Sequence, residues 1–401
     1  MADVSIPSGV GTYFELAFPA GTDYTLAQQL VGPLLTAAQN GTLFPDLYDS
    51  NGAAIPTVPG GDTGFLQIQE QSSPLTTPVT IPSGYSFTAI ETYNFANITG
   101  NGGTGDVTLI SSVSGVEFNT GGGSGTVVAG SGDNLIGTPT SGGGNYLFVG
   151  GDGNDTFTAF SGNDTISPGG GSNLVGLANG NDSVGLSGTN DTVVASSGND
   201  TITTTGYDAA LIFGGSGQLN FVNGSAPSTV VGGTGSETIQ GGVGGGLFQG
   251  GSAGDNSITG GAGAATIFGG GSGDTLAAGG SLGDVLVAAS GNETLTSADS
   301  QGLDTMYGGS GSDAMIAGLG GDLMDGGPGA MNFEFTMGLT NASSTYNVFN
   351  YHAGDTVTLS GYSGTPEFAS AGGNTVLSLS DGTKVTFVGV ASGSDINIQT
   401  S

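Results

Sequence analysis

Residues 150–167 read GGDGNDTFTAFSGNDTIS. The triplet Gly-Asn-Asp occurs twice in this stretch, nine residues apart, and an apolar residue follows each copy. Aligned on the sixth position of each nine-residue unit, the chain places there Asp155, Asp164, Asn173, Asp182, Asp191 and Asp200. Two places further on stand Phe157, Ile166, Val175, Val184, Val193 and Ile202. A fixed short period of this kind predicts a repeat architecture.

The repeats continue beyond residue 200 in a looser form. The register shifts at GYDAALIF (206–213), and later units end in strand-like triplets, as in GGTGSETIQ and GGAGAATIF. Further repeats are marked, at steps of nine to eleven residues, by Asp274, Asp284, Glu293, Asp304, Asp313 and Asp322. The array therefore extends from about Gly121 to Glu334.

A nine-residue unit is too short for a helical hairpin, but it suits a tight turn of about six residues and a strand of about three. The central residue of such a strand points inward, and its two neighbours point outward. Two units then make one coil of about 18 residues, with a strand on each face and a turn on each edge. The sequence predicts an all-β fold, a parallel β-roll or β-solenoid, in which glycine supplies the positive φ angles and close approach that the turns need.

The acidic residues of the turns predict a cation. In a coil of two strands, positions 18 residues apart fall on the same edge, and carboxylates stacked at about 5 Å repel one another. Ca²⁺ takes six to eight oxygen ligands and would remove this repulsion. The candidate metal ligands are Asp155, Asp164, Asp182, Asp191, Asp200, Asp274, Asp284, Asp304, Asp313 and Asp322.

The composition excludes several functional classes. The chain has one Lys+Arg against 33 Asp+Glu, a formal net charge of −32, so the clustered cations that nucleic-acid binding requires are missing. Attraction to an anionic membrane is disfavoured for the same reason, and no apolar run reaches the ~18 residues of a membrane helix. The N-terminal MADVSIPSGVG lacks the basic and apolar regions of a secretory signal.

GGDGNDTFT (150–158) matches the G-G-x-G-x-D-x-U-x nonapeptide, and the array resembles the calcium-binding repeats of the RTX family. The resemblance implies Ca²⁺ bound in a parallel β-roll. It also implies export by a type I secretion machinery to the outside of a Gram-negative bacterium. Residues 351–362 (YHAGDTVTLSGY) and 372–390 resemble RTX export domains, whose uncleaved C-terminal signal would replace an N-terminal one.

Parts of the array depart from the RTX pattern. Where the aspartates are most regular, AFSGND, LANGND and ASSGND replace the paired glycines; where the glycines persist, as in GGVGGG, the acid is often missing. The asparagines beside the acids allow an alternative in which amide ladders hold the coils without metal. These residues are Asn154, Asn163, Asn181, Asn190 and Asn199.

Two regions flank the array. Residues 1–120 predict a small β-rich domain with one short helical segment at 25–39, either kinked or beginning at Pro33. Residues 335–401 predict a β-rich cap and secretion domain, because the last coil would otherwise leave an open sheet edge. The predicted domains are thus 1–120 for assembly or anchoring, 121–334 for the solenoid and 335–401 for the cap.

Enzymatic activity has little support in the sequence. The single histidine, His352, has no GxSxG-type nucleophile before it, and no HExxH pattern for zinc occurs. We therefore expect a non-enzymatic, extracellular structural protein that binds copies of itself in a surface layer, filament or biofilm matrix. Two alternatives stay open. One is a solenoid that binds ice or cell-surface polysaccharide, suggested by outward Thr156, Thr165, Thr192 and Thr201; the other is a polysaccharide-active enzyme.

Overall fold

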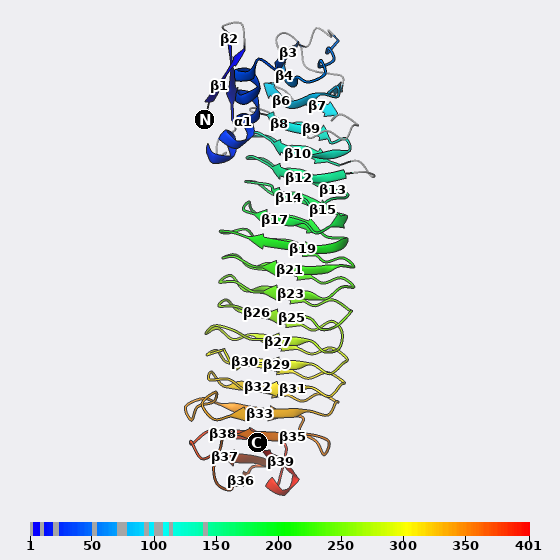
Figure 1. The fold of residues 1–401 in the computed structure, drawn as a ribbon. Helices are drawn as coiled ribbons and strands as arrows, with labels where there is room; N and C mark the ends of the chain where they lie inside the picture. The colour runs from blue at the N-terminus through cyan, green and yellow to red at the C-terminus, as the bar shows by residue number, and fades with distance from the viewer. Residues whose placement is uncertain are drawn as a thin grey trace. The chain divides into compact units, whose positions relative to one another are not determined.

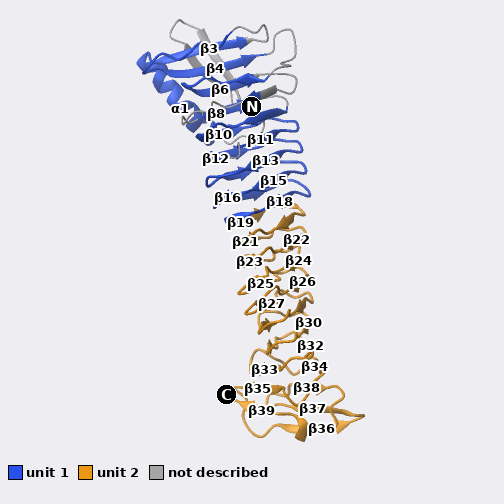
Figure 2. Cartoon of the chain, turned by 90° about the vertical axis from the view of Figure 1, so that its right-hand side faces the viewer, with its two compact units in different colours: residues 1–201 blue, residues 202–401 orange. Residues whose placement is uncertain are grey.

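The computed structural model describes residues 3–8, 12–18, 24–49, 54–69, 78–91, 96–99, 107–111, 115–138 and 143–401. The chain divides into two compact units, residues 1–201 and 202–401 (Figure 2). In each unit most of the chain forms short parallel strands that stack in chain order (Figure 1). Each coil contributes one strand to each of two sheets, called sheet I and sheet II here, which lie on opposite sides of the unit (Figure 2).

The strands of unit 1 follow this pattern from residue 43 onward. Sheet I of unit 1 contains β3 (Leu43–Asp49), β4 (Thr63–Gln69), β6 (Tyr85–Glu91), β8 (Val107–Ser111), β10 (Gly123–Val128), β12 (Gly143–Val149), β14 (Thr165–Ser167), β16 (Asn179–Gly180), β17 (Ser183–Leu186) and β19 (Ser197–Thr204), which crosses the division. Sheet II of unit 1 contains β5 (Val79–Thr80), β7 (Ala96–Thr99), β9 (Val116–Asn119), β11 (Leu135–Gly137), β13 (Thr156–Ala159), β15 (Leu174–Leu177) and β18 (Thr192–Val194).

The register confirms a coil of two nine-residue units. In sheet II, Thr156 pairs with Leu174 and Leu174 pairs with Thr192, so each coil spans 18 residues. The apolar residues that follow the acids by two places line the interior: Phe157 and Val175 of sheet II are at most 1% exposed. The all-β solenoid predicted from the period of nine is therefore confirmed.

A helix covers sheet I of unit 1. Helix α1 (Tyr24–Asn40) runs through Pro33 without stopping, which resolves the alternatives left open by the sequence. Its apolar face, with Val31 and Leu34 buried, packs on Phe65 of β4 and Phe87 of β6 in one hydrophobic cluster. Strand β4 is consequently buried on both faces, one against the coil interior and one against the helix.

This packing bears on the prediction that residues 1–120 serve assembly or anchoring, because it uses apolar residues that such a surface would need. The LVGPLL segment lies in α1, and Phe18 is fully buried in the same cluster. The side chains of Tyr13 and Phe14 lie outside the described part of the chain, although both residues belong to β2 (Thr12–Ala17), which pairs antiparallel with β1 (Asp3–Ser8). Most of this apolar surface is thus used within the unit.

Unit 2 repeats the two-sheet pattern. Sheet I of unit 2 contains β21 (Gln218–Val222), β23 (Glu237–Gln240), β25 (Ser257–Thr259), β27 (Thr275–Ala277), β29 (Thr294–Thr296), β31 (Ala314–Ile316), β33 (Asn332–Thr336), β35 (Thr356–Ser360) and β39 (Ile398–Thr400). Sheet II of unit 2 contains β20 (Leu211–Phe213), β22 (Ser228–Val231), β24 (Gly246–Gln249), β26 (Ala265–Phe268), β28 (Val285–Val287), β30 (Asp304–Tyr307), β32 (Asp322–Asp325), β34 (Tyr346–Phe349), β38 (Lys384–Phe387), β37 (Asn374–Ser378) and β36 (Glu367–Ala371).

The C-terminal residues combine parallel and antiparallel pairing. Strand β38 pairs parallel with β34, whereas β36, β37 and β38 form an antiparallel meander. A short 3₁₀ helix, η1 (Gly393–Asp395), precedes β39, which pairs parallel with β35. Within the described ranges, no helix has both the length and the apolar character needed to cross a bilayer.

Candidate functional site

Nine of the ten predicted metal ligands lie at, or directly before, the first residue of a strand, Asp200 lies within β19, and all ten are buried. At the sheet I edge the structure places Asp164, Asp182 and Asp200 in unit 1 and Asp274 and Asp313 in unit 2. At the sheet II edge it places Asp155 and Asp191 in unit 1 and Asp284, Asp304 and Asp322 in unit 2. The stacking along two separate edges follows the spacing of 18 residues.

Along the sheet I edge of unit 1, each carboxylate bonds the backbone of the coil before it. Oδ1 of Asp164 accepts from the backbone N–H of Tyr146 at 2.7 Å, and Oδ1 of Asp182 accepts from that of Asp164 at 2.7 Å. Oδ1 of Asp200 accepts from the N–H of Asp182 at 3.1 Å. The aspartates therefore form a hydrogen-bonded ladder through the backbone, here called the aspartate ladder.

The sheet II edge of unit 1 forms the same ladder with an amide in it. Asn134 donates its backbone N–H to Asp155 Oδ1 at 2.8 Å, and Asp155 donates its own to Asn173 Oδ1 at 2.8 Å. Asn173 in turn donates to Asp191 Oδ1 from its backbone at 2.7 Å and from Nδ2 at 2.9 Å. A neutral amide therefore fits a ladder position and gains a side-chain hydrogen bond to the next carboxylate.

The asparagine ladder considered from the sequence is present as well, on the exposed side of the sheet I edge. Asn145 Oδ1 accepts from the N–H of Asn163 at 2.8 Å, and Asn163 Oδ1 accepts from that of Asn181 at 2.8 Å. Asn181 Oδ1 accepts from Asn199 at 2.9 Å. These oxygens bond the following coil, whereas the neighbouring carboxylates bond the preceding coil, so the two ladders coexist and run in opposite directions.

On the sheet II edge of unit 1 an exposed asparagine also reaches the following coil, but with a different partner. Asn154 Oδ1 accepts from the N–H of Ser172 at 2.8 Å. Asn190 has a positive φ of 61°. The predicted amide ladder is therefore regular on one edge only.

Unit 2 has ladder residues that the sequence reasoning did not assign. Glu237 donates its N–H to Asn256 Oδ1 at 2.8 Å, and Asn256 donates to Asp274 Oδ1 at 2.9 Å. Glu293 donates to Asp313 Oδ1 at 2.9 Å. Asp355 accepts from Met331 at 2.9 Å and is fully buried.

A sequence signal for the additional acids exists. Glu237, Glu293 and Asp355 are each followed by threonine and then an apolar residue, as are Asp155 and Asp164. Glu237 and Asp355 lie where the regular spacing of acids is interrupted, which is why the spacing alone did not select them. Glu293 lies nine residues after Asp284 and marks a repeat in the sequence, but the candidate ligands include only aspartates. An acid-Thr-apolar pattern, independent of spacing, would have found all three.

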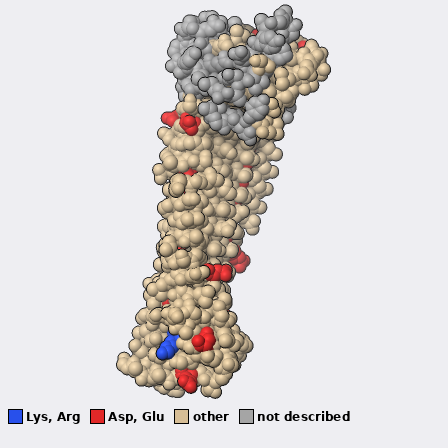
Figure 3. Space-filling view, turned by 90° about the vertical axis from the view of Figure 1, so that its left-hand side faces the viewer, with Lys and Arg blue, Asp and Glu red and all other residues tan. Residues whose placement is uncertain are grey.

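Burial raises the pKa of the ladder carboxyls. Desolvation is the main cause, and it raises the pKa of Asp155, Asp164 and Asp304 to about 6, against an ordinary 3.8. It raises the pKa of Asp182 and Asp322 to about 7, and the charges of neighbouring ladder acids add to the effect. On the face drawn in Figure 3, the visible carboxylates are few and scattered, which agrees with this burial.

A calcium ion needs oxygen atoms that are free to bind it. Oδ1 of each ladder aspartate described above is used by the backbone, but Oδ2 of Asp155, Asp164, Asp182 and Asp304 is buried and has no hydrogen-bond donor among the described residues. A buried carboxylate oxygen without a donor is costly, and a cation would satisfy it. These orphaned oxygens fit Ca²⁺.

A glycine keeps the space beside one of these oxygens open. A Cβ atom on Gly150 would lie 2.5 Å from Oδ2 of Asp155. The first glycine of the nonapeptide is thus required beside the carboxylate that the sixth position supplies. Among the described residues, no three His, Cys, Asp or Glu side chains converge on one point. Turn carbonyls would therefore complete the coordination of an ion held by these carboxylates, as Ca²⁺ permits.

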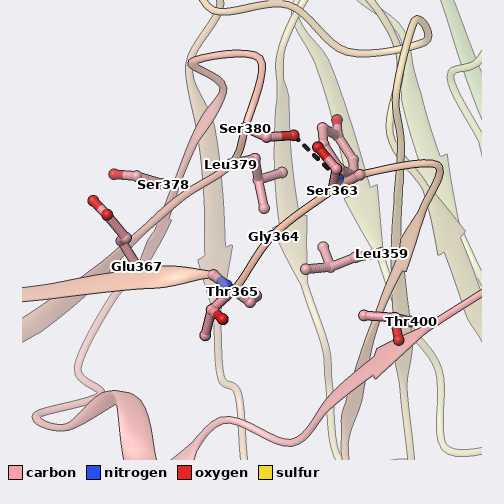
Figure 4. Close-up of a pocket in the computed structure, with 11 residues that line it drawn as sticks. Leu359, Ser363, Gly364, Thr365, Glu367, Ser378, Leu379, Ser380 and Thr400 are labelled. Atoms are coloured by element: carbon pink, nitrogen blue, oxygen red, sulfur yellow. Dashed lines mark hydrogen bonds between the residues drawn. The ribbon is translucent and has the colours of Figure 1, made fainter.

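A second candidate site is a pocket in the C-terminal part of unit 2. It has a volume of about 310 Å³ and is lined by Leu359, Leu379, Glu367 and Ser380, among others (Figure 4). The backbone N–H of Ser363 donates to Ser380 Oγ at 3.3 Å. The lining offers one carboxylate and no histidine, so it does not resemble a hydrolytic centre.

The comparisons agree with the geometry of the turns. The family model described as the RTX calcium-binding nonapeptide repeat matches four segments, residues 140–175, 186–206, 250–281 and 299–330. No curated protein matches the chain. RTX repeats bind calcium and imply a secreted, extracellular protein of the type I export class. The chain is a parallel β-solenoid protein that carries RTX calcium-binding nonapeptide repeats in both of its units.

Proposed function

We propose that this protein is a non-enzymatic structural protein of the Gram-negative cell surface, which assembles with copies of itself into a surface layer, filament or biofilm matrix. Its ladder aspartates, Asp155, Asp164, Asp182, Asp191, Asp200, Asp274, Asp284, Asp304, Asp313 and Asp322, bind Ca²⁺ together with turn carbonyls and so hold the coils together. The observation that carries the proposal is the open edge at each end of the parallel pairing.

Two terminal strands each have one partner among the described residues. Strand β3 pairs with β4 alone, and β39 pairs with β35 alone. Backbone N–H and C=O groups on the other edge of such a strand can pair with another chain. A contact between the β39 edge of one copy and the β3 edge of the next would be heterologous, and would therefore continue into a filament instead of closing a dimer. Pro45 in β3 lacks an N–H, so this ladder would be shorter than a full strand allows.

The absence of enzymatic activity is part of the proposal. His352, the one histidine of the sequence, has Nδ1 3.3 Å from Oδ1 of Asp355 and Nε2 3.2 Å from the carbonyl oxygen of Gly327. Asp355 is occupied by two backbone donors, Met331 and His352 itself. These contacts assign the histidine a structural role at the end of the array.

The test is sedimentation velocity and electron microscopy of the purified chain, with Ca²⁺ at neutral pH and separately near pH 4. We expect polymers under at least one condition, because each treatment reduces the charge of −32. The N–H of Ser401 donates to Leu359 of β35, and the N–H groups of successive strand residues point to opposite edges, so the N–H of Thr400 points to the free edge of β39. Thr400→Pro removes this donor from the free edge. This variant should shorten the polymers, and Thr400→Ala should not. A monodisperse monomer under both conditions would contradict the proposal.

A second function has one supporting observation. Outward threonines and a serine stand in register on sheet I of unit 2, with Thr238, Ser257, Thr275 and Thr294 on successive strands. Of the threonines named from the sequence, Thr156 and Thr192 do not form such a column, since Leu174 stands between them, whereas Thr165 pairs with Ser183. A regular hydroxyl column suits an ordered polar surface such as ice or a polysaccharide, and an ice-growth assay would test this alternative.

A further inference from the structure

The outer face of sheet II in unit 2 carries more apolar residues than that of sheet I. On sheet II, one outward column contains, on successive strands, Phe213, Val231, Gln249, Phe268, Val287 and Tyr307. Four outward side chains of sheet II are exposed large apolar residues: Phe213 at 36%, Leu247 at 42%, Phe268 at 37% and Tyr307 at 45%. The outer surface of sheet II from β20 to β34 is called the apolar face here.

Sheet I of the same unit provides an internal comparison. Its outward columns contain no aromatic residue over these strands: Thr238, Ser257, Thr275, Thr294 and Ala314 form one line, and Gln240, Thr259, Ala277, Thr296 and Ile316 form the other. Both sheets have the same parallel geometry, so the fold itself does not require aromatic residues on an outer face. A run of exposed apolar residues on one sheet only marks an interaction surface.

We propose that the apolar face binds the apolar face of a second copy of this chain, in an isologous contact. This inference rests on the proposed function, because it names the lateral surface through which copies associate, as distinct from the strand edges at their ends. Lateral and end-to-end contacts together would give a sheet or bundle instead of a single filament.

The first argument for a second copy is charge. A chain with a formal net charge of −32 repels its own copies wherever carboxylates of the two copies would meet at the surface. Among the outward positions of the eight strands β20 to β34, the one carboxylate is Asp325, whose Oδ1 accepts from Asn350 Nδ2 at 2.7 Å and from the N–H of Gly327 at 3.1 Å. The apolar face therefore brings only one strand carboxylate per copy, that of Asp325, to a contact between two such chains.

The second argument is spacing. Side chains on the apolar face repeat at the strand separation of about 4.8 Å, and only a partner with the same repeat can interdigitate with it along its whole length. The apolar face of a second copy has the same strand separation, because it has the same sequence and fold. Eight strands of about three residues present roughly 400 Å² per copy, so a dimer would bury about 800 Å² and would be weak on its own. In an assembly, many such contacts would act together.

The main experiment compares two triple variants by sedimentation velocity over a range of concentrations. The first, Phe213→Thr with Phe268→Thr and Tyr307→Thr, makes the apolar face polar with a residue that favours strands. The control, Thr238→Ala with Thr275→Ala and Thr294→Ala, changes the same number of outward residues on sheet I. We expect the first variant to associate laterally at least tenfold more weakly than the wild type, with an unchanged melting temperature, and the control to associate as the wild type does.

The absence of cysteine from the chain allows a second measurement. Thr266→Cys places a thiol on the apolar face, and Thr275→Cys places one on the outer face of sheet I. With a short bifunctional thiol reagent, the first should give several times more covalent dimer than the second. Equal yields from the two positions would overturn the inference.

The outcomes separate this inference from the proposed function. If the triple threonine variant assembles as the wild type does, the apolar face is not the lateral contact, and the structural role stands. If the wild type stops at a dimer that this variant abolishes, the inference stands and polymer formation is wrong. If the wild type never dimerises and the variant instead loses retention on insoluble polysaccharide, the face binds carbohydrate and the inference is wrong.

Discussion

The two oxygens of a ladder aspartate lie in different environments. In Asp182, Oδ1 accepts a hydrogen bond from the backbone of the preceding coil, while Oδ2 is buried without a donor among the described residues. Oδ1 stabilises the fold in any protonation state in which it can accept this hydrogen bond. Oδ2 destabilises the fold when the carboxylate is charged, so the residue responds to calcium and to pH through this oxygen.

Substitution at Asp182 should separate these two effects. Asp182→Asn keeps the acceptor for Asp164 and adds a donor toward Asp200, as Asn173 already does toward Asp191. We expect Asp182→Asn to stabilise the calcium-free protein at neutral pH and to weaken its response to Ca²⁺. Asp182→Ala leaves the buried N–H of Asp164 unsatisfied and should cost about 1–3 kcal/mol. Thermal unfolding with and without Ca²⁺ checks both, and equal melting temperatures for the two variants would contradict this assignment.

The raised pKa values predict how the calcium-free protein depends on pH. Burial raises the pKa of Asp164 to about 6 and that of Asp182 to about 7, above the 3.8 of an exposed aspartate. A group with a raised pKa in the folded state contributes stability below its unfolded pKa and loses it as the pH rises through the folded value. The calcium-free protein should therefore melt at a progressively lower temperature from about pH 4 to pH 8. Calorimetry in metal-free buffer measures the melting temperature across this pH range. A melting temperature that rises from pH 4 to pH 8 would contradict the prediction, because it would show that the folded protein stabilises the charged carboxylates.

The period of nine predicted the ladder aspartates of unit 1, because strict spacing puts equivalent residues on one edge. It did not predict Glu237 and Asp355, since insertions in unit 2 change the coil length while the backbone pairing is preserved. Glu293 does mark a repeat by its spacing, although the candidate ligands include only aspartates. Nor did the sequence indicate that each carboxylate bonds the backbone of the coil before it. That direction depends on which way the side chain turns, and spacing carries no information about it.

At the scale of the element, the glycines of the turns set how closely coils approach. Gly180 in β16 has a φ of 143°, and a Cβ atom there would collide with the carbonyl oxygen of Gly162 in the preceding coil. Gly185 in β17 has no atom within 4 Å of the corresponding position. The repeat therefore contains glycines that the packing requires and others that it does not.

This difference can be tested with a matched pair. Gly180→Ala should destabilise the protein by at least about 2 kcal/mol, because both the backbone conformation and the neighbouring coil oppose a side chain. Gly185→Ala should be nearly neutral or slightly stabilising, since it restricts the unfolded chain without a clash. Urea unfolding of both variants measures the difference, and similar midpoints would mean that the coils can separate to accept a methyl group.

Helix α1 shows the limit of prediction at this scale. Its apolar periodicity predicted a helical segment, but Gly32 and Pro33 left its continuity open. The helix continues because Val31 and Leu34 bury against Phe65 and Phe87, a tertiary contact that compensates for the hydrogen bond that proline cannot make. Strands β13, β15 and β18 of sheet II needed no such contact to be predicted, since their period of two and their spacing of 18 residues are regular.

For the whole molecule, calcium removal should have a large effect. An ion that binds only the folded coils adds RT ln(1 + [L]/Kd), about 2.7 kcal/mol per site at a hundred times Kd. We expect the melting temperature at neutral pH to be markedly higher in millimolar Ca²⁺ than in chelator, and Mg²⁺ to substitute poorly because it demands a smaller octahedral site. If chelator has no effect, the amide and aspartate ladders hold the coils without metal.

Export provides the second prediction at this scale. If residues 335–401 carry the type I signal, their deletion should abolish secretion from the native host, and an N-terminal tag should leave secretion intact. The deletion also removes β34, β35, β38 and β39, so loss of secretion could reflect misfolding. A passenger protein fused ahead of residues 335–401 controls for this, and it should be exported. Secretion of the truncated chain would place the signal elsewhere.

The opposed directions of the aspartate and asparagine ladders bear on how the array responds to mechanical force. In unit 1, Asp182 holds its coil to the one before it, and Asn181 accepts from the one after it. An interior coil is therefore hydrogen-bonded to both neighbouring coils, and it cannot detach without breaking the bonds to both. A terminal coil is hydrogen-bonded to one neighbour only. Under tension, such an array should unfold from its ends, one coil at a time. The extension of a stretched fibre should therefore increase in small steps while the interior coils stay folded.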